Sequence, residues 1–266
     1  MRITIVGCGS IGTTLAHAAD NMNEVKRIYL LDKDRHLADM LASQLKKAIV
    51  IDSVEEELYH CDLVIEAASQ EAARQILPAV VSRGVDMMIM SVGALVEDEF
   101  RNSILEKAKT YESRVFIPSG AVCGTDGLRA ASLESLDRVE LVTTKGPKSL
   151  EDVPYLIEHG IIVEDLKEVT TVYSGPAREA VALFPRNVNV AATVSLLGVG
   201  FDRTLVTIVV DPEAHSNSHE LRVTGAFGEM TCHTYNVPAP DNPKTSHLAA
   251  LSAISALKRI IRNEWV

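Results

Sequence analysis

The chain has 266 residues, 47% of them hydrophobic and 23% charged, so it is long enough for a large core and too apolar to be disordered. Its 26 Lys and Arg against 36 Asp and Glu give a net charge of −10, which argues against a surface for nucleic acid or an anionic membrane. The four cysteines are far apart, with no C-x-x-C pair, and do not form the framework of a secreted disulfide scaffold. We therefore expect a globular protein of the reducing cytoplasm, without a signal peptide or a membrane span.

The first half of the chain alternates short apolar runs with helical patterns. Strands are predicted at residues 3–6, 27–31, 62–67, 87–91 and 114–117. Apolar residues at helical spacing lie between them, at 11–23, 34–47, 70–82 and 97–111. Repeated strand–helix alternation predicts a doubly wound parallel sheet with right-handed crossovers, an α/β domain over residues 1–120.

The pattern changes after Pro118. Residues 136–144, 205–211, 220–226 and 230–237 alternate as the strands of a mainly antiparallel sheet with one wet face would. Helical patterns lie at 125–132, 177–183 and 190–198. A last helix at 244–263 has an apolar stripe of Leu248, Leu251, Ile254, Leu257 and Ile261. We predict a second, α+β domain over residues 121–242.

The strongest local signal is a G-x-G-x-x-G, at residues 7–12, that follows the first strand and opens the first helix. Such glycines allow a tight turn, the approach of a pyrophosphate and close packing of helix on strand, which predicts a Rossmann-type dinucleotide site. Asp32 ends the second strand about 20 residues further on, where an acid binds the ribose hydroxyls. The predicted cofactor-binding residues are Gly7, Gly9, Ser10, Ile11, Gly12 and Asp32.

The same region leaves the choice between NAD and NADP open. Asp32 favours NAD, because the 2′-phosphate of NADP would meet a carboxylate. Lys33 and Arg35 beside it could each pair with that phosphate.

Two further turns with glycine follow predicted strands. The stretch 91–94 (S-V-G-A) could line the cofactor groove or cap a helix. Small residues at 119–127 (S-G-A-V-C-G-T-D-G) would let the backbone lie against a flat ring, so we interpret this stretch as the wall of the nicotinamide site; a hinge is the alternative. Cys123 within it has no neighbouring base in the sequence and is interpreted as a packing residue rather than a catalytic thiol.

His219 is the histidine best placed for catalysis. Strand alternation puts it on one face with Leu221 and Val223, and a histidine at the mouth of an apolar strand face is suited to acid–base chemistry near neutral pH. A structural histidine is the alternative, and His215 and His233 are competing candidates.

The segment 242–246 (N-P-K-T-S) has the proline and hydroxyl residues of a helix start. Lys244, Thr245 and Ser246, with free backbone N–H groups, would also bind a carboxylate; a cap without a ligand is the alternative. Asn189, in F-P-R-N-V-N at 184–189, enters another helix and could cap it or bond a carboxamide. We predict no metal site.

Five motifs, G-C-G-S-I-G, S-G-A-V-C-G-T-D-G, F-P-R-N-V-N-V-A-A, N-S-H-E-L and N-P-K-T-S, resemble in order and spacing those of the L-aspartate dehydrogenase family, over nearly the whole chain. N-S-H-E-L and N-P-K-T-S are much more specific than the glycine motif. The resemblance implies an N-terminal Rossmann domain for NAD or NADP, with the C-terminal helix (243–266) packed back on it. It also implies a second domain that carries the substrate and pairs subunits into a homodimer. By the same resemblance His219 is the catalytic histidine, and Ala121 and Asn189 contact the nicotinamide.

The implied reaction is the reversible oxidation of L-aspartate to iminoaspartate, released as oxaloacetate and ammonia, which can feed NAD biosynthesis. Hydride passes from C2 of aspartate to C4 of the nicotinamide, and His219 can serve as the base that keeps the amine neutral. Lys244 is the first candidate partner for the substrate carboxylates, ahead of Arg186 and Lys145.

Two alternatives stay open. One is another two-domain reductase, such as a dihydrodipicolinate reductase, whose H-H-x-x-K motif is absent here, or a homoserine dehydrogenase. The other is a non-catalytic NAD-binding redox sensor.

Overall fold

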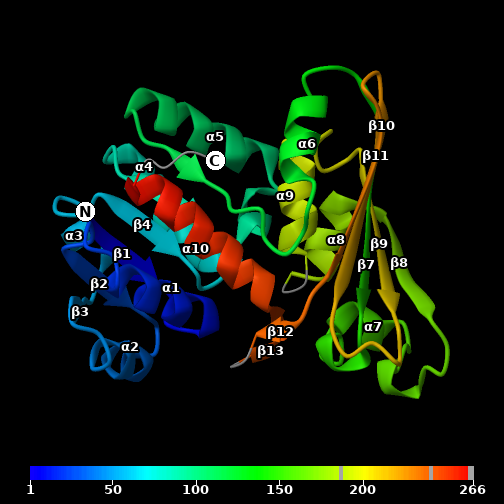
Figure 1. Cartoon of the computed structure of the whole chain (residues 1–266), viewed down its shortest axis with the longest axis horizontal. Helices are drawn as coiled ribbons and strands as arrows, with labels where there is room; N and C mark the ends of the chain where they lie inside the picture. Colours follow the sequence, from blue (N-terminus) through cyan, green and yellow to red (C-terminus); the bar gives the residue numbers. More distant parts are fainter. Residues whose placement is uncertain (186–187, 240–241, 263–266) are drawn as a thin grey trace. The chain divides into compact units, whose positions relative to one another are not determined.

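The computed structural model describes residues 1–185, 188–239 and 242–262, and the chain divides into two compact units (Figure 1). Unit 1 comprises Met1–Pro118 and Ala250–Val266, and unit 2 comprises Ser119–Ala249. The chain therefore leaves unit 1 once and returns to it through its C-terminal helix. None of the helices within the described ranges is long and apolar enough to cross a membrane.

Unit 1 is built on a parallel sheet. Over the described residues its strand order is β3-β2-β1-β4-β5-β6. The chain adds β2 and β3 on one side of β1 and then β4, β5 and β6 on the other, as in a Rossmann fold. The strands are β1 (Arg2–Val6), β2 (Arg27–Leu31), β3 (Ala48–Val50), β4 (Leu63–Glu66), β5 (Asp86–Ile89) and β6 (Val115–Phe116). Strands covered on both faces need near-continuous apolar runs, which is why the central ones were predicted from the sequence. The predicted fold class is confirmed for this unit.

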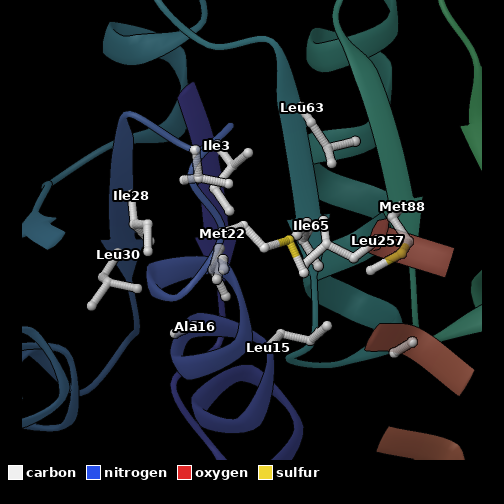
Figure 2. Close-up of a cluster of buried hydrophobic side chains, with 14 of the residues drawn as sticks. Ile3, Leu15, Ala16, Met22, Ile28, Leu30, Leu63, Ile65, Met88 and Leu257 are labelled. Atoms are coloured by element: carbon white, nitrogen blue, oxygen red, sulfur yellow. The ribbon is translucent and has the colours of Figure 1, made fainter. Parts of the chain in front are cut away.

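Helices cover both faces of this sheet. They are α1 (Ser10–Asp20), α2 (Arg35–Ala42), α3 (Val54–Glu57), α4 (Gln70–Ser82) and α5 (Asp98–Thr110), with a 3-10 turn η1 (Val92–Leu95). Because the right-handed crossovers on the two sides of β1 run in opposite directions, α1 and α4 lie on opposite faces. Helix α10 (His247–Arg262) joins the α1 face, where Leu257 packs with Leu15, Ile65 and Met88 in the core (Figure 2).

Unit 2 contains a second sheet, with strand order β11-β10-β7-β9-β8 over the described residues. Its strands are β7 (Leu136–Lys145), β8 (Thr170–Pro176), β9 (Thr204–Val210), β10 (Ser218–Gly225) and β11 (Gly228–Tyr235). Neighbours are antiparallel except β7 and β9, so the predicted mainly antiparallel sheet is confirmed. One face is buried, with Val139, Leu141 and Leu221 at 0–1% exposure. The helices of this unit are α6 (Thr125–Ala131), α7 (Pro154–Glu158), α8 (Ala177–Leu183) and α9 (Asn189–Leu197).

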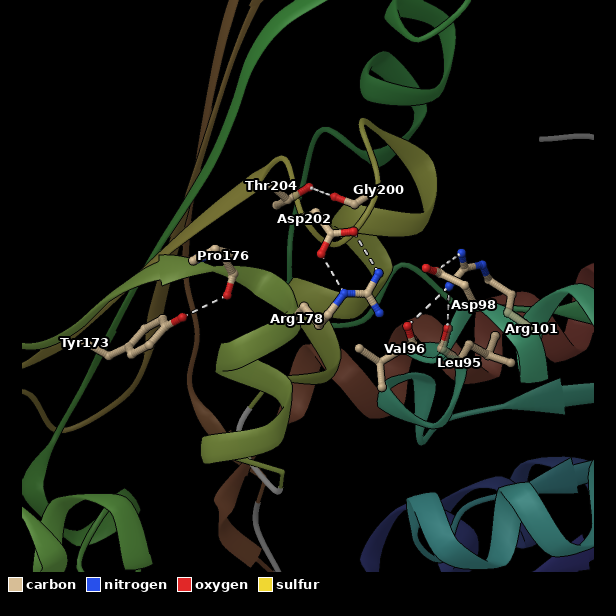
Figure 3. Close-up of polar contacts among 10 residues, drawn as sticks. All are labelled: Leu95, Val96, Asp98, Arg101, Tyr173, Pro176, Arg178, Gly200, Asp202 and Thr204. Atoms are coloured by element: carbon tan, nitrogen blue, oxygen red, sulfur yellow. Dashed lines mark hydrogen bonds and ion pairs between the residues drawn. The ribbon is translucent and has the colours of Figure 1, made fainter.

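Arginine side chains brace a turn in each unit (Figure 3). In unit 2, Arg178 at the start of α8 donates from Nε and Nη2 to the two carboxylate oxygens of Asp202, at 2.6 and 2.8 Å. In unit 1, Arg101 of α5 donates to the Leu95 carbonyl at 2.9 Å and to Asp98 at 2.5 Å. The bidentate Arg178–Asp202 pair fixes the turn between α9 and β9 against α8.

The end of the chain departs from the prediction. Asn242–Ser246 forms strand β13, which pairs with β12 (Pro238–Ala239), and α10 begins at His247. The helix-start interpretation of N-P-K-T-S is therefore wrong, because the segment is extended and its backbone pairs with another strand. The apolar stripe is also partly wrong. Leu248 and Leu251 are 36% and 45% exposed, and the buried residues of α10 are Ala250, Ala253, Ala256 and Leu257.

Candidate functional site

The turn between β1 and α1 has the shape that a diphosphate requires. A Cβ on Gly12 would lie 1.8 Å from the Gly7 carbonyl oxygen, and Gly7 itself has φ +97°, so both positions need glycine. A Cβ on Gly9 would meet nothing within 4 Å, which leaves room beside the turn. Ser10 and Ile11 open α1. No side chain of the described residues caps this helix end, so its first N–H groups are available to an anion.

Asp32 lies beside this turn at the end of β2. One of its carboxylate oxygens accepts the Cys8 N–H at 2.6 Å and the other accepts the Asp34 N–H at 2.9 Å. Asp32, Lys33 and Gly9 help to line a cleft of about 620 Å³. Arg35, by contrast, pairs with Asp52 and Asp39. The residues of the cleft fit a dinucleotide, and Lys33 is the basic side chain among them.

A buried carboxylate joins the loops that follow β4 and β5. Glu66, 0% exposed, accepts the Ala68 N–H at 2.8 Å, the Ser91 hydroxyl at 2.8 Å and the Ser91 N–H at 2.9 Å. Burial raises the pKa of Glu66, and these hydrogen bonds oppose the rise. Ser91 is the N-cap residue of η1, as the capping alternative for S-V-G-A expects, but its hydroxyl donates to Glu66 and does not cap the helix. Glu66 was not predicted from the sequence, although a lone acid at the end of an apolar strand is a signal that could have identified it.

In unit 2, His219 lies on β10, and the predicted strand face is confirmed. His219, Leu221 and Val223 are all buried, at 0–3% exposure. The Thr143 hydroxyl, directly opposite on β7, is 3.0 Å from Nδ1 of His219. Lys145 follows two residues further along β7 on the same face and is also buried.

Burial and then the charge of Lys145 lower the pKa of His219 to about 3. Burial lowers the pKa of Lys145 to about 8. The expectation that His219 titrates near neutral pH is therefore wrong for this structure, because burial away from water disfavours the charged imidazolium. At pH 7 the ring is neutral, with one nitrogen able to accept a proton.

The loop 120–124 lies along β11, next to the strand that carries His219. Asn236 donates from Nδ2 to the Ala121 carbonyl at 3.1 Å, and Thr234 accepts the Cys123 N–H at 3.1 Å. Thr234 is directly opposite His219 in the β10–β11 ladder. The loop that contains Ala121 is thus held against the strand that pairs with the one carrying His219. Cys123 is exposed, so its interpretation as a packing residue is wrong.

Asn189 is near the same loop. It is the first residue of α9, whose N-cap is Val188, so Asn189 is not the capping residue itself. A Cβ on Gly120 would lie 3.8 Å from a methyl of Val190, which puts the start of α9 against the residue before Ala121. Asn236 was missed by the sequence analysis. It is 4% exposed, and its Oδ1 has no hydrogen-bond partner within the described ranges.

Thr245 and Ser246 line a different cleft of unit 2, of about 600 Å³, with Lys148, His215 and Asn217. Ser246 donates to Oδ1 of Asn217 at 2.8 Å. The side chains of Lys244 and Arg186 lie outside the described part of the chain, so their role as carboxylate partners stays a prediction. In the described ranges no three His, Cys, Asp or Glu side chains form a group that could hold a metal ion.

A dinucleotide turn in one unit and a buried histidine beside a small-residue loop in the other define the class of two-domain NAD(P)-dependent oxidoreductases. Residues 7–118 match the family model described as "Homoserine dehydrogenase, NAD binding domain", and residues 126–260 match "Aspartate dehydrogenase, C-terminal". The chain is 46% identical to the L-aspartate dehydrogenase of Methanosarcina acetivorans, over 98% of this chain and 97% of the relative. It is 40% identical to that of Nitrosopumilus maritimus, over 97% and 96%.

Solved structures agree. The crystal structure of aspartate dehydrogenase from Thermotoga maritima matches with a TM-score of 0.76 and 29% identity, over 99% of this chain and 96% of that one. A dihydrodipicolinate reductase from Paenisporosarcina, at 16% identity and a TM-score of 0.53, shares the fold alone. The chain belongs to the L-aspartate dehydrogenase family, as its motifs predicted, and NAD(P) is its cofactor class.

Proposed function

We propose that this chain oxidises L-aspartate to iminoaspartate with NAD(P)⁺, and that water converts the imine to oxaloacetate and ammonia. The observation that carries the proposal is the neutral, buried His219 beside the Ala121 loop, in a chain of this family. Bound NAD(P)⁺ supplies the hydride acceptor, nicotinamide C4. The protein supplies orientation, a proton acceptor and positive charge.

His219 is the proposed catalytic base. If the Thr143 hydroxyl accepts from Nδ1–H, the lone pair of the ring lies on Nε2. That nitrogen can take a proton from the substrate amine and pass it to solvent. The ring, neutral again, can then take a proton from the water that attacks the imine carbon. Burial is the larger cause of the low pKa of His219 and the charge of Lys145 is the smaller one. A carboxylate that pairs with Lys145 would therefore raise the pKa of the ring in part, by offsetting the smaller cause.

Lys145 is the described cation best supported as a partner of one substrate carboxylate. Its pKa of about 8 leaves it mostly protonated at pH 7, and burial beside His219 strengthens a pairing with an anion. Lys244 and Arg186 remain proposed partners for the second carboxylate, with the Thr245 hydroxyl as a donor. The Ser246 hydroxyl would join them by exchanging its hydrogen bond to Asn217 for one to the substrate.

The cofactor contacts are proposed residue by residue. Gly9, Ser10, Ile11 and Gly12 hold the diphosphate through backbone N–H groups, and Asp32 binds the adenosine ribose. Gly7 allows the tight turn beside it, because its own N–H donates to the Leu31 carbonyl at 2.8 Å. Ala121 and Asn189 contact the nicotinamide. The glycine geometry and the position of Asp32 in the same cleft support the first part of this assignment.

We further propose a cytoplasmic homodimer whose product can feed NAD biosynthesis. The outward face of the unit 2 sheet supports pairing, because it leaves Leu205 on β9 at 37% and Tyr235 on β11 at 78% exposure. Light scattering of the purified protein should give twice the chain mass of 28.9 kDa. A mass of one chain at micromolar concentration would exclude the dimer.

The activity itself is tested by absorbance at 340 nm with purified protein, NAD⁺ or NADP⁺, and L-aspartate, with D-aspartate, L-homoserine and L-glutamate as matched substrates. We expect turnover with L-aspartate, and the reverse reaction with oxaloacetate and ammonium. Faster oxidation of L-homoserine would favour the homoserine dehydrogenase alternative. Binding of NAD without hydride transfer to or from any of these compounds would favour the redox sensor.

A further inference from the structure

Two free thiols meet where the loop 120–124 lies along β11. Cys232, Thr234 and Asn236 stand at alternate positions on the inner side of this strand and its extension. Asn236 holds Ala121, and Thr234 holds Cys123 through two hydrogen bonds, one of them from its hydroxyl to Sγ of Cys123 at 3.0 Å. Cys232 lies under the next residue of the loop.

The loop backbone lies so close to Cys232 that position 124 has no room for a side chain. Gly124 has φ +84°, and a Cβ on it would lie 2.5 Å from Sγ of Cys232 and 3.0 Å from its Cβ. Cys123 is the neighbour of Gly124 in the chain, and its Sγ accepts from Thr234, which stands two residues from Cys232 on the same side of β11. The loop and the strand thus bring two sulfur atoms together from positions 109 residues apart in sequence (232 − 123).

Access differs between this pair and the remaining cysteines. Cys123 is exposed and Cys232 is partly exposed, whereas Cys8 and Cys61 are buried at 6% and 7% exposure. An oxidant in solution can therefore reach the first pair in the folded protein and is kept from the other two thiols.

We propose that Cys123 and Cys232 are a site of reversible oxidation, which closes an intramolecular disulfide and lowers the activity by fixing the Ala121 loop to β11. With hydrogen peroxide as oxidant, one thiolate attacks a peroxide oxygen, giving a sulfenic acid and one water. The second thiol then attacks that sulfur, forming the S–S bond and releasing the second water. Two thiols are oxidised and one peroxide is reduced to two waters. A dithiol reductant reverses the reaction by exchange.

The effect on activity rests on the proposed function, because the loop carries Ala121 and Thr234 lies opposite His219. In a disulfide the two Cβ atoms lie about 3.8 Å apart, which is closer than the Cβ atoms of two unbonded thiols in contact need to be. The loop must therefore shift toward β11. Displacing a substrate-positioning group by about 1 Å can cost up to 100-fold in rate, so we expect turnover to fall by roughly tenfold or more.

The test begins with the reduced, purified chain and hydrogen peroxide. Thiol titration should detect two reactive thiols in the native protein and all four after denaturation. After oxidation the counts should be zero and two, the mass should fall by about 2 Da, and tryptic peptides 115–129 and 223–244 should be found linked. Turnover should drop and return with dithiothreitol. If four thiols remain after denaturation, or if the linked chains run as a covalent dimer on a non-reducing gel, the intramolecular pair is excluded.

Cys232→Ser is the matched variant, since it keeps the Thr234 and Asn236 contacts to the loop. It should keep the basal turnover, contain one reactive native thiol, and resist inactivation by peroxide. The proposed switch would be overturned if peroxide lowered the turnover of this variant as much as that of the unmodified protein. It would also be overturned if the unmodified protein formed the disulfide without any drop in turnover. The thiol count and the peptide map need no turnover, so they decide the disulfide even if the proposed aspartate oxidation fails.

Discussion

At the residue scale, the molecule places a histidine and a lysine where both are costly to charge. His219 and Lys145 share the buried face of the unit 2 sheet, and each carries a pKa below its ordinary value. Buried titratable groups destabilise a fold unless a ligand or a partner compensates them, and such groups concentrate at functional sites. A substrate that brings negative charge would be favoured beside these two groups.

Replacing His219 by alanine should lower kcat by about 10²–10⁴-fold, the usual contribution of general acid–base catalysis. The affinity for NAD should persist, because the glycine turn and Asp32 belong to unit 1. Steady-state kinetics and NAD titration by fluorescence measure the two effects. His215→Ala is the control, since His215 is exposed in the loop before β10, off the strand face that carries His219, and its loss should cost much less. If His215→Ala lost its activity and His219→Ala kept it, His215 would replace His219 as the proposed catalytic histidine.

Lys145→Met should raise KM for L-aspartate by about 10–100-fold, because a charge-assisted bond contributes about 1.5–3 kcal/mol. The same change should stabilise the fold at pH 7. The ammonium is held at a pKa of about 8 against an ordinary 10.5, a burial cost of roughly 3 kcal/mol.

The sign of this effect follows from proton linkage. Below pH 8 both folded and unfolded chains hold the proton of Lys145, so the cost is fully present. As the pH rises from about 8 to 10.5 the folded chain loses the proton first, and the stability of the unmodified protein recovers. Urea unfolding at pH 7 and pH 10.5 should show an advantage of the methionine variant that shrinks at the higher pH. An advantage independent of pH would point to packing rather than charge.

At the scale of elements, the turn after β1 and the end of β2 act together. Asp32→Ala removes the ribose ligand and also the acceptor of the Cys8 N–H, so binding of both cofactors should weaken. The affinity for NAD should fall more than that for NADP, by about tenfold to a hundredfold. The reason is that NADP still offers its 2′-phosphate to Lys33, whereas NAD has no such group. KM values for both cofactors measure the change in preference. Lys33→Ala should show the opposite bias, and equal losses for both cofactors in Asp32→Ala would refute the ribose assignment.

The loops after β4 and β5 depend on Glu66 in a similar way. Glu66→Gln puts an amide donor against one of the three donors that the carboxylate now accepts, which should destabilise unit 1 by about 1–3 kcal/mol. KM for NAD should rise, because Ala68 and Ser69 line the cofactor cleft. Thermal unfolding and cofactor kinetics test both effects, with exposed Glu71→Gln on α4 as the control. Unchanged stability would mean that Glu66 accepts these bonds as a neutral acid.

Elements with a strong pattern could be predicted from the sequence, whereas contacts between distant segments could not. Helix α4 was predicted at its observed bounds, since serine precedes it and apolar residues recur at helical spacing. The short strand β3 and the β12–β13 pair exist through their partners rather than through their own composition. His219 was found from alternation along one strand. Thr143 and Asn236 were missed, because their relation to His219 and Ala121 depends on strand register and loop packing.

At the scale of the whole molecule, the last helix makes unit 1 discontinuous in sequence. Ala253, Ala256 and Leu257 of α10 are 0–5% exposed and belong to the core of this unit. Figure 2 shows Leu257 in this core with Leu15 and Ile65. The first 118 residues therefore lack part of their own core until the end of the chain is made. A chain that stops after residue 249 should lose NAD binding, although the glycine turn and Asp32 are all present in it.

Leu257→Ala tests this dependence without truncation. Removing a fully buried leucine should lower the free energy of unfolding by about 2–5 kcal/mol, through lost transfer energy and the cavity left behind. Leu251→Ala is the matched control on the same helix, 45% exposed, and should change stability by less than about 0.5 kcal/mol. Urea unfolding of both variants, with and without saturating NAD, gives the comparison. Since NAD binds the folded unit 1, it should restore part of the lost stability in Leu257→Ala. Equal effects of the two substitutions would show that the cofactor unit folds without its C-terminal helix.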